Sequence, residues 1–215
     1  MGPMNKTTLA ALLLATPLAG AQIEYLLQDR YVEIYATLPG GDDGMLTSSS
    51  GMGGFDATLS EWLGNAQGSA WAYATQTSSL QAGAMHATGA ADGSSGPPVG
   101  SSSGLGRTGL SVNFRLTEAV DYTLDFSVFS EFANYSFTGP SLDIVKGFDF
   151  ALSDPGVHLS GTLGPGDYAF DIAIESGAEA QGIGSNFDFS FVVVPAPGGV
   201  GVLALGVLAT ARRRR

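Results

Sequence analysis

Residues 110–116 read Leu-Ser-Val-Asn-Phe-Arg-Leu, and every second side chain in this stretch is apolar. Successive side chains of a β-strand point to opposite faces, so this period of two predicts a strand with one buried and one solvated face. The stretch therefore indicates a sheet that carries a core on one side. The predicted inward set is Leu110, Val112, Phe114 and Leu116.

The same alternation recurs along the chain. The clearest repeats lie at residues 32–38, 122–128, 148–152, 168–174 and 187–193, and less regular strands are predicted at 23–27, 57–63 and 70–76. Turn residues separate them at Leu38–Gly44, Ser153–Gly156 and Leu163–Asp167. Many short strands without a helical period predict an all-β fold, an antiparallel two-sheet β-sandwich of jelly-roll-like type. Residues 83–109, rich in Gly and Ser, are predicted to form a long surface loop of this domain.

Charge is distributed unevenly over the 215 residues, whose net charge is −11. Residues 22–195 hold all 20 acids and four basic residues, a net charge of −16, whereas the two ends carry only basic charge. This acidity argues against nucleic acid as a partner, because phosphate binding requires a basic face. The chain has no cysteine, which excludes disulfides, thiol nucleophiles and cysteine-ligated metals.

The first 21 residues have the pattern of a secretory signal peptide. Lys6 precedes an apolar run at residues 9–15, which is too short to span a bilayer, and Ala19 and Ala21 form an A-x-A site before Gln22. We expect signal peptidase to cut after Ala21.

The last residues combine prolines, an apolar run and arginines. Pro195, Ala196, Pro197 and Gly198 lead into the apolar residues 199–211, followed by Arg212, Arg213, Arg214 and Arg215. As a helix this run is about 20 Å long, a marginal membrane span that residues 191–194 could extend. The positive-inside rule predicts that the arginines stay cytoplasmic and the preceding chain lies outside.

This tail resembles the PEP-CTERM sorting signal, in the Val-Pro-Ala-Pro-Gly variant of planctomycete-type bacteria. The resemblance covers residues 192–215, with Ala196 where the family's motif has Glu. It implies that an exosortase cuts near Pro195–Pro197 after transient anchoring in the membrane by the helix at 199–211. The expected domains are a signal peptide at 1–21, an extracellular sandwich at 22–191 and a sorting signal at 192–215.

The sequence contains few motifs that are typical of a catalytic or cofactor-binding site. Gly104-Leu-Gly106-Arg-Thr-Gly109 matches a dinucleotide fingerprint but lacks the strand before it and the helix after it. Gly100-Ser-Ser102-Ser-Gly104 matches a nucleophile elbow and fails for the same reason. We expect no catalytic residues and no cofactor. Calcium is the alternative, with oxygens from Asp42 and Asp43 or from Asp149 and Asp154.

Two readings of function remain. The first is an exported structural or interaction protein of the cell surface or extracellular matrix, and not an enzyme. The alternative is a carbohydrate-binding module of the extracellular polysaccharide, in which exposed aromatic rings stack on sugars. Its candidate contacts are Trp62, Trp71, Tyr73 and Tyr135, for which packing in the core or at a sheet edge is the competing explanation.

Overall fold

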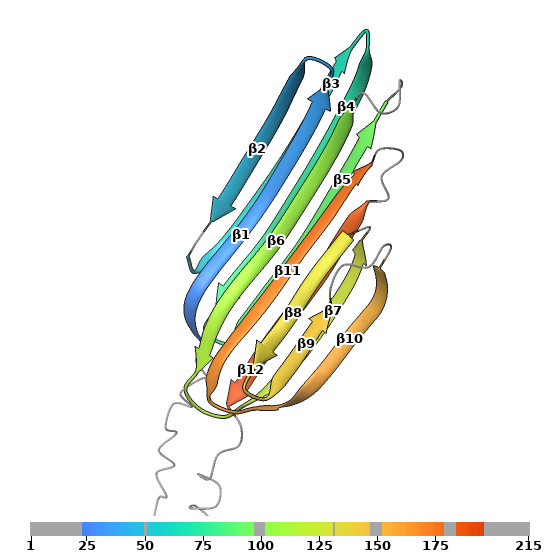
Figure 1. The fold of residues 1–215 in the computed structure, drawn as a ribbon. Helices are drawn as coiled ribbons and strands as arrows, with labels where there is room; N and C mark the ends of the chain where they lie inside the picture. Colours follow the sequence, from blue (N-terminus) through green and yellow to red (C-terminus); the bar gives the residue numbers. More distant parts are fainter. Residues whose placement is uncertain are drawn as a thin grey trace, which may run out of the picture.

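The computed structural model describes residues 23–49, 51–96, 102–130, 132–146, 152–178 and 184–195. Within these ranges the chain forms twelve β-strands and no helix, and every strand pair is antiparallel. The strands form two sheets, which lie one behind the other in Figure 1. The prediction of an all-β fold with two antiparallel sheets is confirmed.

Sheet A has the strand order β2-β1-β6-β11-β8-β9 and faces the viewer in Figure 1. Its strands are β1 (Ile23–Leu38), β2 (Gly41–Ser49), β6 (Ser103–Leu116), β8 (Phe132–Gly139), β9 (Leu142–Lys146) and β11 (Gly166–Ala178). β1 is one strand with a bulge between Tyr25 and Leu27, where the sequence predicted two separate strands. The bulge moves the inward positions from odd to even residue numbers, and the next two inward positions hold the polar residues Gln28 and Arg30, so the apolar alternation resumes only at Val32.

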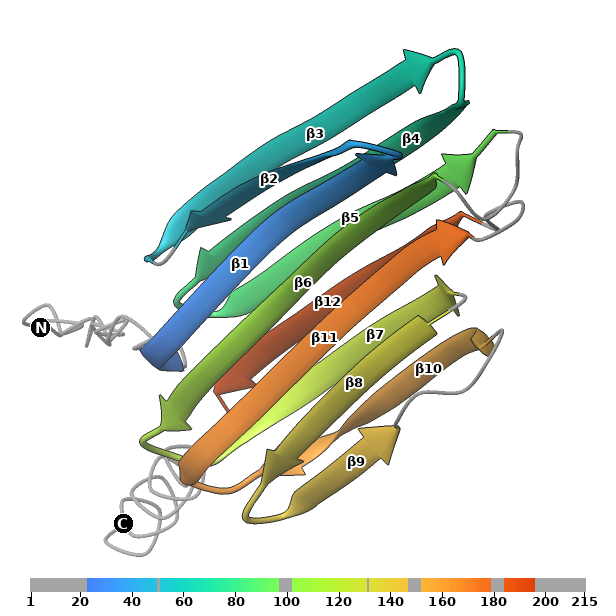
Figure 2. The same cartoon turned by 45° about the horizontal axis from the view of Figure 1, so that its top comes forward.

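Sheet B has the strand order β10-β7-β12-β5-β4-β3 and lies behind sheet A. Figure 2 shows its strands running beneath those of sheet A in a second layer. Its strands are β3 (Gly53–Asn65), β4 (Gly68–Gln81), β5 (Ala84–Ser95), β7 (Val120–Ser130), β10 (Leu152–Leu163) and β12 (Ser185–Pro195).

The core lies between the sheets and includes the alternating apolar residues predicted from the sequence. Leu110, Val112, Phe114 and Leu116 are all buried on the inner face of β6. The inward residues of β11 and β12 are buried in the same way, and Phe170 stacks on Phe189 across the gap with ring centroids 3.8 Å apart. Burial of this apolar surface is the main force that holds the two sheets together.

The sandwich is uneven in thickness. Around β7, β8, β11 and β12 the sheets are separated by large rings such as Phe114, Phe137 and Phe191. Around β4, β5 and β6 the two sheets approach each other closely, because the residues that face each other are small. A Cβ at Gly104 would collide with the carbonyl oxygen of Trp71, and a Cβ at Gly106 would collide with the carbonyl oxygen of Tyr73. The backbones of the two sheets therefore touch along one half, which we call the thin half, and are held apart by rings in the other.

The predicted loop over residues 83–109 is wrong. β5 covers Ala84–Ser95 and β6 begins at Ser103, and both belong to the thin half. Gly and Ser suggested a loop, but here they supply the small side chains that close packing of two backbones requires.

Two further predictions need correction. The predicted turn at Ser153–Gly156 is a bulge inside β10, where the pairing with β7 shifts between Asp154 and Val157. The predicted turn at Leu38–Gly44 is shorter, since β2 begins at Gly41 and Gly40 takes a φ of 93°, which favours glycine. The turn before β11, at Gly164–Pro165, is confirmed.

Arg30 fixes the connection between the two sheets at β2–β3. Its side chain points inward from β1 with 1% of its surface exposed, and its guanidinium donates to the carbonyls of Gly51 at 2.6 Å and Gly53 at 2.9 Å. The guanidinium carbon lies 5.5 Å from the Phe55 ring centre, in cation–π range. Arg30 thus holds the crossover segment against the core.

The sandwich extends past the predicted boundary at residue 191. β12 continues to Pro195, and Val193 is buried against the core. Residues 192–194 therefore belong to the sandwich and cannot lengthen a membrane helix while β12 is formed. Among the residues that the structure describes, no helix is long and apolar enough to cross a membrane.

Candidate functional site

Three aromatic side chains, one exposed and two half-buried, gather on the outer face of sheet B, and we call them the aromatic face. They are Trp62 of β3 with Trp71 and Tyr73 of β4. Trp62 and Trp71 are direct cross-strand partners, so their side chains leave the sheet side by side. The rings of Trp71 and Tyr73 have centroids 6.1 Å apart and planes within 10° of parallel. Three of the four predicted aromatic contacts are thus brought together.

The sequence of β4 explains why these rings lie on the outer face. Ala70, Ala72 and Ala74 fill the inward positions and are buried, which leaves the outward positions to Trp71 and Tyr73. Behind them Gly104 and Gly106 of β6 press directly on the backbone of the two aromatic residues. The aromatic face is therefore supported by backbone contact, a rigid arrangement of the kind that preorganises a binding surface.

Trp62 is the most exposed of the three, with 65% of its surface accessible. Its ring lies over Gly64, where a Cβ would collide with the indole. The absence of a side chain at Gly64 lets the indole lie along the outer face of β3.

Polar side chains border the rings. A shallow depression of about 370 Å³ is lined by Trp71, Tyr73, Ala90, Ala91, Asp92, Gly184, Ser185 and Asn186. Asp92 is the cross-strand partner of Tyr73, and its Oδ1 accepts a hydrogen bond from the Gly93 amide at 2.7 Å. Asn186 lines the depression from β12, the strand that pairs with β5. Flat rings beside a carboxylate and an amide offer a sugar both stacking on its apolar face and partners for its hydroxyls.

Tyr135 does not belong to this site. It points into the core from β8 with 4% of its surface exposed, and its ring packs on Phe126 with centroids 4.4 Å apart. Its prediction as a glycan contact is wrong. The sequence does indicate that Tyr135 is buried, because Ala133, Tyr135 and Phe137 alternate with polar residues and share one apolar face.

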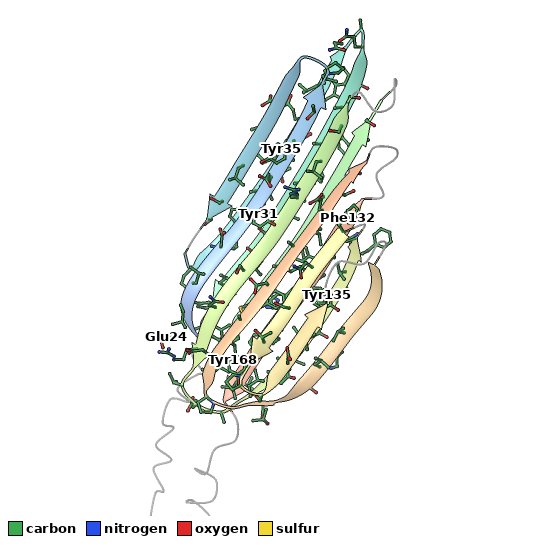
Figure 3. All side chains as sticks on the ribbon, in the orientation of Figure 1. Glu24, Tyr31, Tyr35, Phe132, Tyr135 and Tyr168 are labelled. Carbon is green, nitrogen blue, oxygen red and sulfur yellow. The ribbon has the colours of Figure 1, made fainter. Side chains whose placement is uncertain are left out.

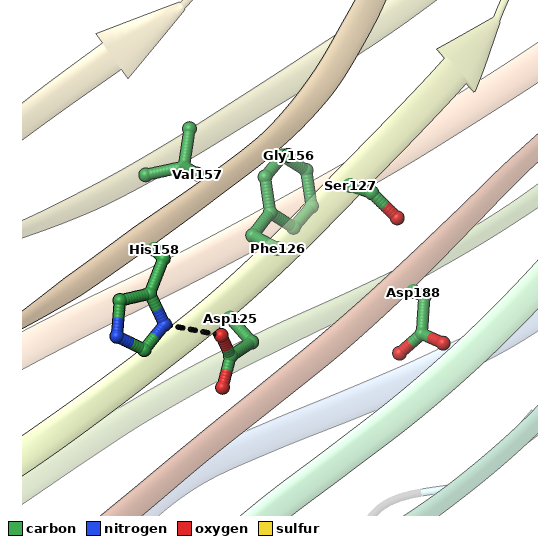
Figure 4. Close-up of a pocket in the computed structure, with 7 residues that line it drawn as sticks. All are labelled: Asp125, Phe126, Ser127, Gly156, Val157, His158 and Asp188. Carbon is green, nitrogen blue, oxygen red and sulfur yellow. Dashed lines mark hydrogen bonds and ion pairs between the residues drawn. The ribbon is translucent and has the colours of Figure 1, made fainter.

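A second depression, of about 430 Å³, lies elsewhere on sheet B (Figure 4). His158 Nδ1 lies 2.5 Å from Asp125 Oδ1, and both side chains are more than half exposed. The other ring nitrogen points away from Ser127 in Figure 4, so these residues lack the arrangement of a Ser-His-Asp triad. The cross-strand register pairs His158 with Asp125, a contact that the sequence alone did not reveal.

Metal ligands are not grouped in the part of the chain that the structure describes. No cluster of three or more His, Cys, Asp or Glu residues that could hold a metal occurs there. Of the calcium candidates, Asp43 is an exposed residue of β2, and the side chains of Asp42, Asp149 and Asp154 lie outside the described residues.

The glycine motif at 104–109 has a structural explanation. Gly104 and Gly106 face inward and allow the contact with β4, while Gly109 faces outward beneath the ring of Tyr31. The motif lies within β6 and no helix follows it, so the geometry of a dinucleotide site is absent here. Ser102 of the second motif donates to the Ser69 carbonyl at 2.9 Å and is buried.

The processing signals fall outside the described residues. This holds for Ala19, Ala21 and Gln22 at one end, and for Ala196, Pro197, Gly198 and Arg212–Arg215 at the other. The backbone of Pro195 is described and ends β12. Comparison of the chain with protein families, with curated proteins and with solved structures finds no match.

Proposed function

We propose that this chain is an exported protein that binds an extracellular polysaccharide through the aromatic face of sheet B. The observation that carries the proposal is the placement of Trp71 and Tyr73, with parallel rings 6.1 Å apart, beside Trp62, Asp92 and Asn186. Aromatic rings on the outer face of a sheet can stack on the apolar faces of sugars. This placement favours the binding module over a purely structural role.

Charge narrows the class of polysaccharide. The outer face of sheet B carries Asp56, Asp92, Asp121, Asp125 and Asp188, and none of the six strands of this sheet contains Lys or Arg. A polyanionic glycan would be repelled by this face, so we expect a neutral glycan. Extended β-1,4-linked chains of glucose or N-acetylglucosamine fit this description.

Export and sorting form the second part of the proposal and rest on the sequence. A signal peptide cut after Ala21 and a PEP-CTERM-like tail recognised by an exosortase would deliver the sandwich to the cell surface or matrix. The jelly-roll-like topology is a proposal too, supported by the alternation of β5, β6, β7 and β8 between the two sheets. Mass spectrometry of the native protein should find Gln22 at the N-terminus and no peptide that contains Arg212–Arg215; an intact tail on the surface form contradicts the exosortase route.

Binding is tested on the purified sandwich with an array of neutral and charged glycans. Trp71→Ala should weaken binding to the best neutral glycan by tenfold or more, about 1.4 kcal/mol, because stacking is lost at the centre of the face. Trp62→Ala should weaken it less. The matched control is Leu46→Ala, which removes a side chain of similar exposure, 63%, from sheet A. A flat array, or equal binding by all four proteins, contradicts the proposal.

A further inference from the structure

Sheet A carries an unassigned depression on its own outer face. A trough of about 260 Å³ is lined by Tyr31 and Glu33 of β1, Arg107 of β6, Phe132 of β8, and Ala173, Ile174 and Glu175 of β11. Figure 3 shows Tyr31 and Phe132 on strands that are separated by β6 and β11. We call it the sheet A trough.

The floor of the trough exists because two adjacent strands lack large outward side chains at one level. Gly109 of β6 pairs with Tyr31 on one side and with Ala173 of β11 on the other. The ring of Tyr31 lies over Gly109, since a Cβ there would come within 2.6 Å of the Tyr31 Cε1 atom. The ring of Tyr31 thus covers Gly109 and forms one side of the trough, Phe132 lines the other side, and the methyl group of Ala173 contributes the floor between them.

One end of the trough is a fixed network of polar groups. Arg107 Nε donates to Glu175 Oε2 at 2.7 Å, and its Nη1 lies 3.5 Å from Glu33 Oε2. The Tyr35 hydroxyl donates to Glu33 Oε1 at 2.5 Å. The network offers donors and acceptors beside aromatic surface, and its pairings hold both the guanidinium and the carboxylates in place.

We infer that the sheet A trough is a second saccharide site, and that the protein cross-links polysaccharide chains held on its two opposite faces. A sugar ring placed on the floor would contact Tyr31 or Phe132 with its apolar face and reach Glu33, Arg107 or Glu175 with its hydroxyls. The trough stands on its own geometry, whereas the cross-linking rests on the proposed function of the aromatic face. Two sites on a rigid body that point in opposite directions cannot bind neighbouring sugars of one stretch of chain, so they favour binding of two chains.

The experiment counts sites by calorimetric titration with cellohexaose and chitohexaose. The test variant is Ala173→Leu, which fills the trough with a solvent-facing side chain. Its matched control is Ala169→Leu, the same change on the same face of β11, outside the trough and opposite Asn113 and Thr138. We expect two sites per chain in the wild type and in Ala169→Leu, and one site in Ala173→Leu and in Trp71→Ala.

Cross-linking is measured as the viscosity of a hydroxyethyl cellulose solution. The wild type and Ala169→Leu should raise it, and either single-site variant should bind the polymer without raising it. A single-site variant that still raises the viscosity overturns cross-linking by the two faces of one chain.

The outcomes separate this inference from the proposed function. If Trp71→Ala removes all binding and Ala173→Leu changes nothing, the trough is only an ion-paired part of sheet A and the inference is wrong, while the proposed function stands. If Trp71→Ala changes nothing and Ala173→Leu abolishes binding, the trough site stands and both the proposed function and the cross-linking fail. A wild type that binds neither hexasaccharide overturns both.

Discussion

Single glycines determine how closely the two sheets approach. Gly104 has no room for a Cβ, because the carbonyl of Trp71 and the backbone of Ser94 occupy that space. By contrast, Gly54 of β3 has only the Ser78 carbonyl near it, 4.0 Å from a Cβ. Backbone cannot move aside as a flexible side chain can, so the two positions should respond very differently to one methyl group.

Gly104→Ala should lower the free energy of unfolding by about 1–3 kcal/mol through overpacking, and it should weaken glycan binding by shifting Trp71. Gly54→Ala, the control, should leave stability within about 0.5 kcal/mol. Urea unfolding followed by tryptophan fluorescence measures both. Coincident unfolding curves for the two variants would show that the sheets are not in backbone contact.

Arg30 and Arg115 contrast a buried with an exposed guanidinium. Arg30→Met should destabilise the protein by about 1–3 kcal/mol, because it removes the two charge-assisted hydrogen bonds to the carbonyls of Gly51 and Gly53. Arg115→Met removes an exposed ion pair with Asp167 and should change stability little, because solvent screens it. Limited proteolysis should cut the β2–β3 connection of Arg30→Met first; resistance equal to that of Arg115→Met would contradict this role.

At the scale of the strand, alternation in the sequence was a reliable guide and composition was not. The inward residues of β6, β11 and β12 were predicted correctly because each strand buries one apolar face. β5 escaped prediction since its inward positions, which include Ala87, Gly89, Ala91 and Gly93, carry almost no hydrophobic signal. Small residues pack against backbone, and only the position of the opposing strand reveals that.

Tyr25 joins the start of β1 to the end of β4. Its hydroxyl donates to the Gln81 carbonyl at 2.8 Å, and burial raises its pKa well above the usual value. Below about pH 10 the phenol is neutral in both the folded and the unfolded chain, and its contribution is fully present. Above that pH the unfolded chain releases the proton first, so stability should fall as pH rises.

The loss of stability at alkaline pH should therefore be smaller in Tyr25→Phe than in the wild type. It is measured as the change in the urea midpoint of unfolding between about pH 8 and about pH 11. Some loss should remain in the variant, because burial also raises the pKa of Tyr31. Equal losses in the two proteins would exclude Tyr25 as a source of the pH dependence.

For the whole molecule, net charge alone does not show where the charged residues lie on the fold. The acidity of residues 22–195 predicts that nucleic acid is not a partner, but only the structure shows that the basic residues Arg107 and Arg115 both lie on sheet A. Trp62, Trp71 and Tyr73 were predictable as candidate ring contacts. Which residues lie together in the candidate site depends on strand pairing, and no local sequence pattern encodes that pairing. The register places Trp62 opposite Trp71 and Asp92 opposite Tyr73.

Affinity electrophoresis should show retardation by hydroxyethyl cellulose and none by polygalacturonate, a polyanion that the all-acidic face of sheet B repels. The difference should narrow as salt rises from about 0.05 to about 0.5 M, since the Debye length shortens. Tighter binding to polygalacturonate at low salt would contradict the assignment of a neutral ligand.

The uneven thickness of the sandwich bears on its response to hydrostatic pressure. Pressure favours states that eliminate internal voids. In the thin half there is no room even for a Cβ at Gly104 or Gly106, whereas the ring-filled half contains a partly open cavity of about 20 Å³ among Leu124, Phe126, Tyr135 and Phe137. Compression should therefore loosen the aromatic core first and leave the support of Trp71 and Tyr73 intact, so that the aromatic face keeps its arrangement after the core beneath β7 and β8 has lost order.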